Sequence, residues 1–435
     1  DQTPPTEWHH ALVPKVQQVT YRDLMSAIHD DVNNKGAHLP VTSRDMSLYH
    51  AATSMSRIEL KIANRLSENT LLMAERFATL ANYFGAEYPE KALDKAWRQI
   101  LCGQHHDSIT GTHNEISFVD LMNSYRETME LATDVLNRSL DYLGKAIDSE
   151  DNSLVVFNPL AWRRTDVVTA RIRRTDTKPF CIKDAAGKRV PYEILGEVSE
   201  ENEQILNVRF LGKNLPPMGY RAYSVETDTG KRPNTKKDSG TVIENEFYRV
   251  EVDPSRGGGI VSIFDKNAKR EVLNSDTAHV GNELAILQEV PDREETQHEF
   301  YTTGLAMFSY DKPARIEREQ NAISSTIRST YAMGEICNVI QEIRLYKGIK
   351  RIDFLTILQD YQGEDNLFCI TFPTNLKGAA PIFDERFGVV TRNDSKGYLD
   401  FRTHRQIMFS DCAVYAANKW MEYGVNAIAQ VGENK

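Results

Sequence analysis

Residues 104–112 read QHHDSITGT, and the sequence on either side of them decides how this part of the chain folds. Ahead of them, apolar residues recur at helical spacing from Pro89, a residue favoured at the first position of a helix. Behind them, a near-heptad pattern runs from Glu115 to Ile147, and Asn114 is suited to cap its first turn. The stretch is therefore predicted to be a tight polar turn between two antiparallel helices.

A third predicted helix precedes both, from Ser56 to Phe84, and Gly85 follows it as a suitable C-terminal cap. Because both connections are short, we predict a three-helix bundle over residues 43–150. The residues expected to face its core are Ile58, Ile62, Leu66, Asn69, Met73, Phe77, Leu80 and Phe84, then Leu93, Trp97, Ile100 and Leu101, and then Val119, Met122, Met129, Leu136, Leu143 and Ile147.

After residue 152 the pattern changes to short β-rich runs separated by turns, which predicts antiparallel sandwiches and an α+β fold class. A polar stretch over residues 226–240 is expected to be a loop that divides a first β-sandwich subdomain, 151–240, from a large β-sandwich, 241–435. The predicted strands lie at 154–157, 166–172, 205–211, 220–225, 247–252, 260–264, 323–331, 336–345, 352–358 and 367–372.

The first 42 residues fit neither region. A strand end at residues 19–21 and a helix at residues 22–32 would be the last strand-helix unit of a domain that lies mostly upstream. The chain also starts without methionine, so we expect that processing or excision has removed an N-terminal portion.

The bulk composition narrows the class of protein. With 435 residues, 40% hydrophobic and 26% charged, the chain is expected to form two to four globular domains. A net charge of −10 argues against nucleic acid as a partner, and no apolar run approaches the roughly 20 residues of a membrane span. Five widely spaced cysteines suggest neither a disulfide framework nor a thiolate metal site.

The turn carries two histidines and a carboxylate, which suggests chemistry. Side chains at adjacent helix positions point about 100° apart, so His105 and His106 are not expected to bind one ion together, although one of them could. Asp107 could orient a substrate. The alternative is that all three cap and pack an inter-helix turn, and the residue types alone favour it, because one histidine falls short of the three or four ligands that zinc usually has.

QHHDSITGT resembles the signature of the α-mannosidases of glycoside hydrolase family 38, in which Gln-His-His-Asp is followed by a small-residue turn ending in Gly-Thr. The order of further motifs agrees with that family. They are the Lys-x-x-Asn-Arg-x-x-Glu helix at Lys61, Asn64, Arg65 and Glu68, the β motifs VVFNPLAW at 155–162 and ENEFYRV at 244–250, and a looser match at Asp384, Phe387, Gly388 and Arg392.

The resemblance implies that His106 binds an active-site zinc, that Asp107 contacts the sugar and that His105 orients the ligand from behind. It further implies retaining hydrolysis of α-mannosides in mannose-containing glycans, with one carboxylate as nucleophile and another as acid and base. Its fold implies that residues 1–42 end a catalytic α/β barrel and that the large sandwich is galactose-mutarotase-like.

One family feature is missing from the sequence. The His-x-Asp motif followed by tryptophan, the nucleophile and the acid are not found, and His29-Asp30-Asp31, with Asn34 after it, is interpreted as a solvated helix end. We therefore expect the catalytic carboxylates upstream of this chain. On its own the chain is expected to be metal-free, or to bind zinc weakly, and to be inactive.

Two other functions stay open from sequence. In the first, the β region is a non-catalytic carbohydrate-binding or scaffolding module that uses Trp162 and Trp420 as stacking platforms. In the second, strand carboxylates such as Glu335, Glu342 and Asp353 form a catalytic pair, although charges that alternate along strands usually mark a solvent face. The remaining histidines, among them His50, His113, His279, His298 and His404, are expected to be surface or packing residues.

Overall fold

The computed structural model describes residues 18–39, 57–147, 153–200, 203–230, 232–289, 302–375, 381–385, 388–391 and 421–423. The chain divides into two compact units, Asp1–Met46 and Ser47–Lys435. In the first, helix α1 (Tyr21–Lys35) starts at Thr20, whose side chain forms a capping box with Asp23. The predicted strand end at residues 19–21 is therefore wrong, because these residues cap and begin a helix.

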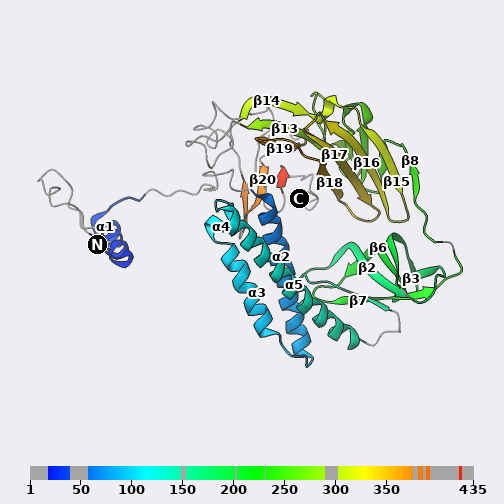
Figure 1. Ribbon diagram of the computed structural model, residues 1–435, viewed down its shortest axis with the longest axis horizontal. Helices are drawn as coiled ribbons and strands as arrows, with labels where there is room; N and C mark the ends of the chain where they lie inside the picture. Colours follow the sequence, from blue (N-terminus) through cyan, green and yellow to red (C-terminus); the bar gives the residue numbers. More distant parts are fainter. Residues whose placement is uncertain are drawn as a thin grey trace, which may run out of the picture. The chain divides into compact units, whose positions relative to one another are not determined.

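The second unit begins with helices α2 (Ile58–Tyr83), α3 (Glu90–Gly103), α4 (His106–Thr110) and α5 (Glu115–Lys145). The three long helices lie side by side, and the short α4 forms part of the turn between α3 and α5 (Figure 1). Asn114 caps α5 as predicted, because its side chain accepts a hydrogen bond from the Ser117 amide. The shared core of the long helices contains Leu60, Leu71, Ala74, Ala78, Leu93, Ala96, Ile100, Tyr125, Ala132 and Val135.

The predicted inward face of α2 is wrong over its first half. Ile58, Ile62 and Leu66 are 52–55% exposed, while a different row of α2, with Leu60, Asn64 and Ser67, is buried. The inner row carries two polar residues, so hydrophobic periodicity selected the neighbouring apolar row instead. Leu101, Val119 and Phe84 were also predicted inside and are exposed.

A small β unit follows the helices. Its two antiparallel sheets have the strand orders β1-β7-β3-β4 and β2-β6-β5, and side chains from both meet in one core around Phe180, Ile182, Val208 and Phe210. The strands are β1 (Ser153–Phe157), β2 (Arg164–Arg174), β3 (Phe180–Asp184), β4 (Arg189–Val190), β5 (Tyr192–Glu200), β6 (Glu203–Leu215) and β7 (Tyr220–Thr227).

A large β unit comes next. The sheets β12-β11-β10-β9 and β18-β17-β16-β15-β8 share a core, and β14-β13-β19 packs its own cluster against β16 and β17. The strands are β8 (Lys236–Asp238), β9 (Val242–Glu244), β10 (Tyr248–Asp253), β11 (Gly259–Asp265), β12 (Arg270–Glu271), β13 (Glu283–Glu289), β14 (Thr302–Phe308), β15 (Arg315–Gln320), β16 (Ser324–Met333), β17 (Cys337–Tyr346), β18 (Ile352–Gln359) and β19 (Asn366–Thr371). Strands β20 (Pro381–Glu385), β21 (Gly388–Thr391) and β22 (Met421–Tyr423) form a further sheet.

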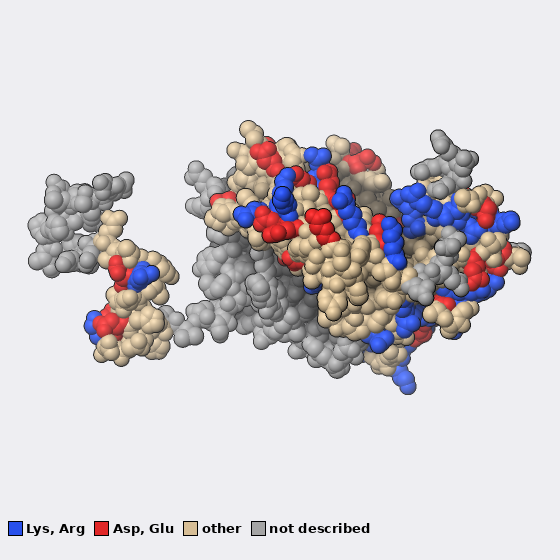
Figure 2. Space-filling view, turned by 90° about the horizontal axis from the view of Figure 1, so that it is seen from below, with Lys and Arg blue, Asp and Glu red and all other residues tan. Residues whose placement is uncertain are grey.

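All ten runs predicted as strands contain strands, whereas the predicted loop at 226–240 is partly wrong. Residues Lys236–Asp238 form β8, which pairs with β15. Lys237 forms ion pairs with Glu317 and Glu319 of β15, so charges that suggested a loop in fact stabilise an edge strand. Basic and acidic side chains are interleaved on the face shown in Figure 2.

Helix α2 contacts the start of the small β unit through specific side chains. Phe77 of α2 meets Phe157 of β1 edge-on, with ring centroids 5.5 Å apart, and Arg76 donates to the Pro159 carbonyl at 3.0 Å. Asn158 is fully buried, and its side-chain amide donates to the carbonyls of Trp162, Leu215 and Pro216. These contacts fix the first strand against the end of the helices.

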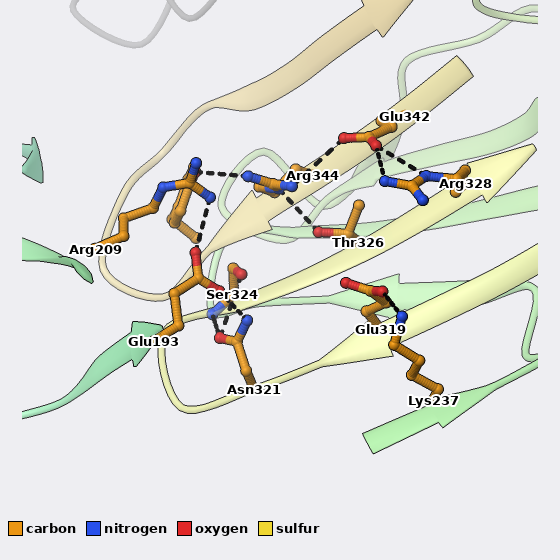
Figure 3. A network of polar contacts seen from close by, with 11 residues as sticks. Glu193, Arg209, Lys237, Glu319, Asn321, Ser324, Thr326, Arg328, Glu342 and Arg344 are labelled. Carbon is orange, nitrogen blue, oxygen red and sulfur yellow. Dashed lines mark hydrogen bonds and ion pairs between the residues drawn. The ribbon is translucent and has the colours of Figure 1, made fainter. Parts of the chain in front are cut away.

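The two β units meet through a polar network (Figure 3) and an apolar cluster. The buried Glu193 of β5 accepts from Arg209 of β6 at 2.7 Å and from Asn321, which precedes β16. Arg351 also bonds to Asp166 of β2 at 3.3 Å. The apolar cluster comprises Leu211, Ile323, Tyr346 and Ile349, with Val167 packed against it.

Among the helices that the structure describes, none combines the length and apolarity needed to cross a lipid bilayer.

The burial of α2 can be tested by comparing Leu71→Ala with Ile62→Ala. Leu71 is fully buried and Ile62 is 53% exposed. We expect Leu71→Ala to lower the free energy of unfolding by about 2–5 kcal/mol, because it leaves a cavity. Ile62→Ala should change it by less than about 0.5 kcal/mol. Urea denaturation measures both, and equal losses would contradict the observed helix phase.

Candidate functional site

The His-His-Asp turn is built at a break between two helices. Helix α3 ends at Gly103, and His105 adopts an extended conformation (φ −54°, ψ 144°) as the N-cap of α4. His105 and His106 therefore do not occupy adjacent positions of one helix, and their rings lie 4.1 Å apart between centroids. The prediction that their side chains diverge by about 100° is wrong, because it assumed a continuous helix.

Potential ligand atoms of His105, His106 and Asp107 lie within 4.8 Å of one another. The Nε2 atom of His106 is 3.3 Å from Oδ2 of Asp107, and the two side chains are 80% and 62% exposed. The structure thus brings together all three residues that the sequence singled out. Because they are exposed, their side chains are accessible to a ligand.

Short-range hydrogen bonds orient the carboxylate and one ring. The Asp107 amide donates to Nδ1 of His105 at 3.3 Å, so that nitrogen keeps its lone pair and the neutral ring carries its proton on Nε2. The hydroxyl of Thr112 donates to Oδ1 of Asp107 at 3.3 Å. The chain can turn back in this way because Gly111 ends α4 at φ +82°.

Side chains of α2 and α5 form hydrogen bonds with the turn and with the end of α3. Lys61 donates from Nζ to the Thr110 carbonyl at 3.2 Å, and Gln104 donates from Nε2 to Oδ1 of the buried Asn64 at 3.2 Å. The hydroxyl of Tyr125 lies 3.1 Å from the Gly103 carbonyl and 3.4 Å from Oδ1 of Asn64. Burial lowers the pKa of Lys61 to about 8 and raises that of Tyr125 to about 12.

Sequence reasoning did not assign this support. Lys61 and Asn64 belong to the Lys-x-x-Asn-Arg-x-x-Glu motif, from which no role was predicted for them. Their spacing of three residues places them on one side of α2, which was the available signal. No feature of the sequence predicts the role of Tyr125, because the contact of its hydroxyl with the end of α3 is visible only in the structure.

Other candidate residues have structural partners. His113 stacks on Phe118, and His279 lies 2.7 Å from the buried Glu283. Glu335 was predicted on a strand, but it is exposed in the turn between β16 and β17. Glu342 pairs with Arg328 and Arg344, and Asp353 with Arg351, so these two strand carboxylates are held in ion pairs. His29 and Asp30 are exposed near the end of α1. His50, His298, His404, Trp420, Phe387 and Arg392 lie outside the described residues.

The asparagines of the two β motifs are buried connectors. Asn245 resembles Asn158 in this, because its amide donates to the carbonyls of Tyr346 and Ile349 while its oxygen accepts from the amides of Phe247 and Tyr248. These motifs therefore mark folding constraints, whereas the His-His-Asp turn is the exposed cluster.

Two family models match this chain. That of the alpha mannosidase middle domain matches residues 48–143, which include the His-His-Asp turn. That of the glycosyl hydrolases family 38 C-terminal domain matches residues 243–421. The chain belongs to glycosyl hydrolase family 38.

Curated relatives of this family 38 chain are longer than it is. Alpha-mannosidase G of Dictyostelium discoideum is 23% identical over 261 residues, which are 55% of this chain and 24% of that protein. Lysosomal alpha-mannosidase of Bos taurus is 25% identical over 223 residues, 46% of this chain and 22% of that protein. The chain thus spans about a quarter of the length of these relatives.

Solved structures share the fold. A family 38 protein from Enterococcus faecalis superimposes with a TM-score of 0.71 at 18% identity, covering 86% of this chain and 50% of that one. An alpha-mannosidase from the same organism gives a TM-score of 0.68 at 18% identity, covering 86% and 49%. The α+β arrangement is therefore that of the family.

The lowered pKa of Lys61 predicts that the free energy of unfolding depends on pH. Its folded value of about 8 lies below the ordinary 10.5, so between these pH values the unfolded chain binds more protons and the free energy of unfolding rises with pH. Lys61→Met lacks this gain, which we place at about 1 kcal/mol because solvent screens the half-buried amine.

Urea denaturation of wild type and Lys61→Met at pH 7.5, 9 and 10.5 measures the effect, and other titrating groups cancel in the difference between the two proteins. Relative to the variant, the wild type should gain stability as the pH rises. A difference that stays constant across this range would contradict the assigned shift.

Proposed function

We propose that this chain is the helical and C-terminal β part of a zinc-dependent α-mannosidase, a retaining glycosidase acting on α-mannosides in mannose-containing glycans. The observation that carries the proposal is the exposed His105-His106-Asp107 cluster, with its donor atoms within 4.8 Å, in a chain of family 38. We further propose that the nucleophile and the acid and base lie outside this sequence. The short span relative to full-length relatives supports this.

The residues of the cluster suit zinc as part of a ligand set. Imidazole nitrogen and carboxylate oxygen are both zinc ligands, but a catalytic site uses three protein ligands and keeps one position open. His106 is proposed as a ligand. His105 is proposed to orient the cluster, because its Nδ1 already accepts the Asp107 amide and its Nε2 carries the proton.

Asp107 is proposed to bind the sugar. Its carboxylate is exposed, is held by Thr112 and can accept hydrogen bonds from sugar hydroxyls. When bound, zinc would supply Lewis-acid contacts to substrate oxygens. The turn itself would position these groups before the substrate arrives, which lowers the entropic cost of reaching the transition state.

We propose the matching domain division. Residues 1–42 would end the catalytic α/β barrel, 43–150 form the three-helix bundle, 151–240 the first β-sandwich subdomain and 241–435 the large, galactose-mutarotase-like sandwich. Separate hydrophobic cores in the helices and in the two β units support it. The boundary between the two compact units at Met46 lies close to the first division.

Hydrolysis of a nitrophenyl α-mannoside tests the function. A polypeptide that joins this chain to the N-terminal region of its family is expected to be active, and His106→Ala should lower kcat/KM by at least about 100-fold. His29→Ala is a matched control, because His29 is exposed on α1. This chain alone should show no hydrolysis. If the chain alone hydrolysed the substrate and His106→Ala abolished this activity, the proposal that the catalytic carboxylates lie outside this sequence would be overturned.

A carbohydrate-binding module is the second candidate, because Trp162 is 60% exposed and could stack on a sugar ring. Isothermal titration of this chain with mannobiose separates the two. The enzyme proposal expects no measurable binding in the absence of metal. Binding that survives both chelator and His106→Ala, and that disappears in Trp162→Ala, would favour the module.

A further inference from the structure

Within the part of the chain that the structure describes, the side chains of His105, His106 and Asp107 form hydrogen bonds and ion pairs only with groups between residues 105 and 112. Such contacts move with the turn and cannot hold it in place. The position of the cluster must therefore be set by what holds its two flanks.

Both flanks are held by α2. On the N-terminal flank, Gln104 donates to Oδ1 of Asn64 at 3.2 Å. On the C-terminal flank, the Thr110 carbonyl accepts from Lys61 at 3.2 Å. Lys61 and Asn64 lie three residues apart, so nearly one turn of a long helix determines the separation of the two flanks.

Burial makes the N-terminal attachment rigid. Asn64 is 3% exposed and Tyr125 is 3% exposed. The Tyr125 hydroxyl lies so close to Gly103 that a Cβ built there would be 2.7 Å from it. The end of α3 therefore packs directly against α5, and only glycine allows that approach.

We propose that Lys61 and Asn64 are positioning residues that fix the Gln104–Thr112 turn and thereby present His106 and Asp107 in a preorganised arrangement. The structural part of this proposal stands on the contacts above. Its catalytic consequence rests on the proposed function.

Amide hydrogen exchange of this chain, read by mass spectrometry, tests the structural part. The readouts are the amides of Ser108 and Ile109, which bond to the His105 carbonyl at 2.9 Å, and of Gly111, which bonds to Ser108. Lys61→Met and Asn64→Ala should each speed their exchange at least about tenfold, because the turn opens locally. Lys61→Arg, which keeps a donor, should restore protection.

Two matched variants serve as controls. Arg65→Met removes a charge from α2 whose bond runs to Glu68 on the same helix, and Asn69→Ala removes an exposed asparagine from α2. Both should leave the turn protected. The amides of α5 report global unfolding. If one of the two variants, Lys61→Met or Asn64→Ala, also loses protection in α5, the other variant decides the test. Unchanged exchange at Ser108, Ile109 and Gly111 in both Lys61→Met and Asn64→Ala overturns the proposal.

The longer polypeptide tests the catalytic part. Lys61→Met should lower kcat on a nitrophenyl α-mannoside by more than it raises KM, since positioning acts in the transition state, and Lys61→Arg should recover most of the loss. If the wild type shows no hydrolysis, the proposed function fails while the exchange result still decides whether α2 fixes the turn. Faster exchange with kcat unchanged would overturn the catalytic part alone.

Discussion

The structure of the candidate site depends on the pairing of α2 with the turn that joins α3 to α5. Lys61 donates a hydrogen bond to one flank of the nine-residue turn and Asn64 accepts one from the other flank, so α2 holds both ends of the segment. The segment carries the one group of histidine and carboxylate side chains among the described residues that could hold a metal. The buried side-chain amide of Asn64 and the half-buried amine of Lys61 thus determine the position of the exposed His105, His106 and Asp107.

The same logic extends into the β units. Asn158 uses its buried side-chain amide to join the carbonyls of Trp162 and Pro216, and Asn245 uses its amide to bind the turn after β17 through the carbonyls of Tyr346 and Ile349. Phe77 against Phe157, and Glu193 with Asn321, then join neighbouring parts of the second unit. Because the side chains of Asn158 and Asn245 are buried, replacing either asparagine would leave buried hydrogen-bonding groups unsatisfied. The motifs that resemble those of the family are therefore of two kinds. The His-His-Asp turn is exposed, whereas Asn158 and Asn245 of the β motifs are buried and stabilise the fold.

The sequence predicted the class of fold well and the faces of the helices less well. The ten β-rich runs predicted as strands all contain strands, although β3, β5, β13, β14 and β15 lie outside those runs. The edge strand β8 was missed because its lysines suggest a loop until Glu317 and Glu319 lie opposite. The inward face of α2 was predicted wrongly because its buried row contains the polar residues Asn64 and Ser67. Asn64 is accommodated there by hydrogen bonds from Gln104 and Tyr125, which are distant in sequence. The proximity of His105 and His106 depends on one extended residue that composition does not reveal.

Ile58, Ile62 and Leu66 form an exposed ridge along α2, spaced four residues apart. Hydration of such an exposed apolar ridge is unfavourable, so the ridge favours association with a second apolar surface. The net charge of −10 works in the opposite direction, because like-charged molecules repel over about a Debye length. Colloidal behaviour of the chain should accordingly be sensitive to ionic strength, with added salt weakening the repulsion and leaving the ridge free to drive clustering.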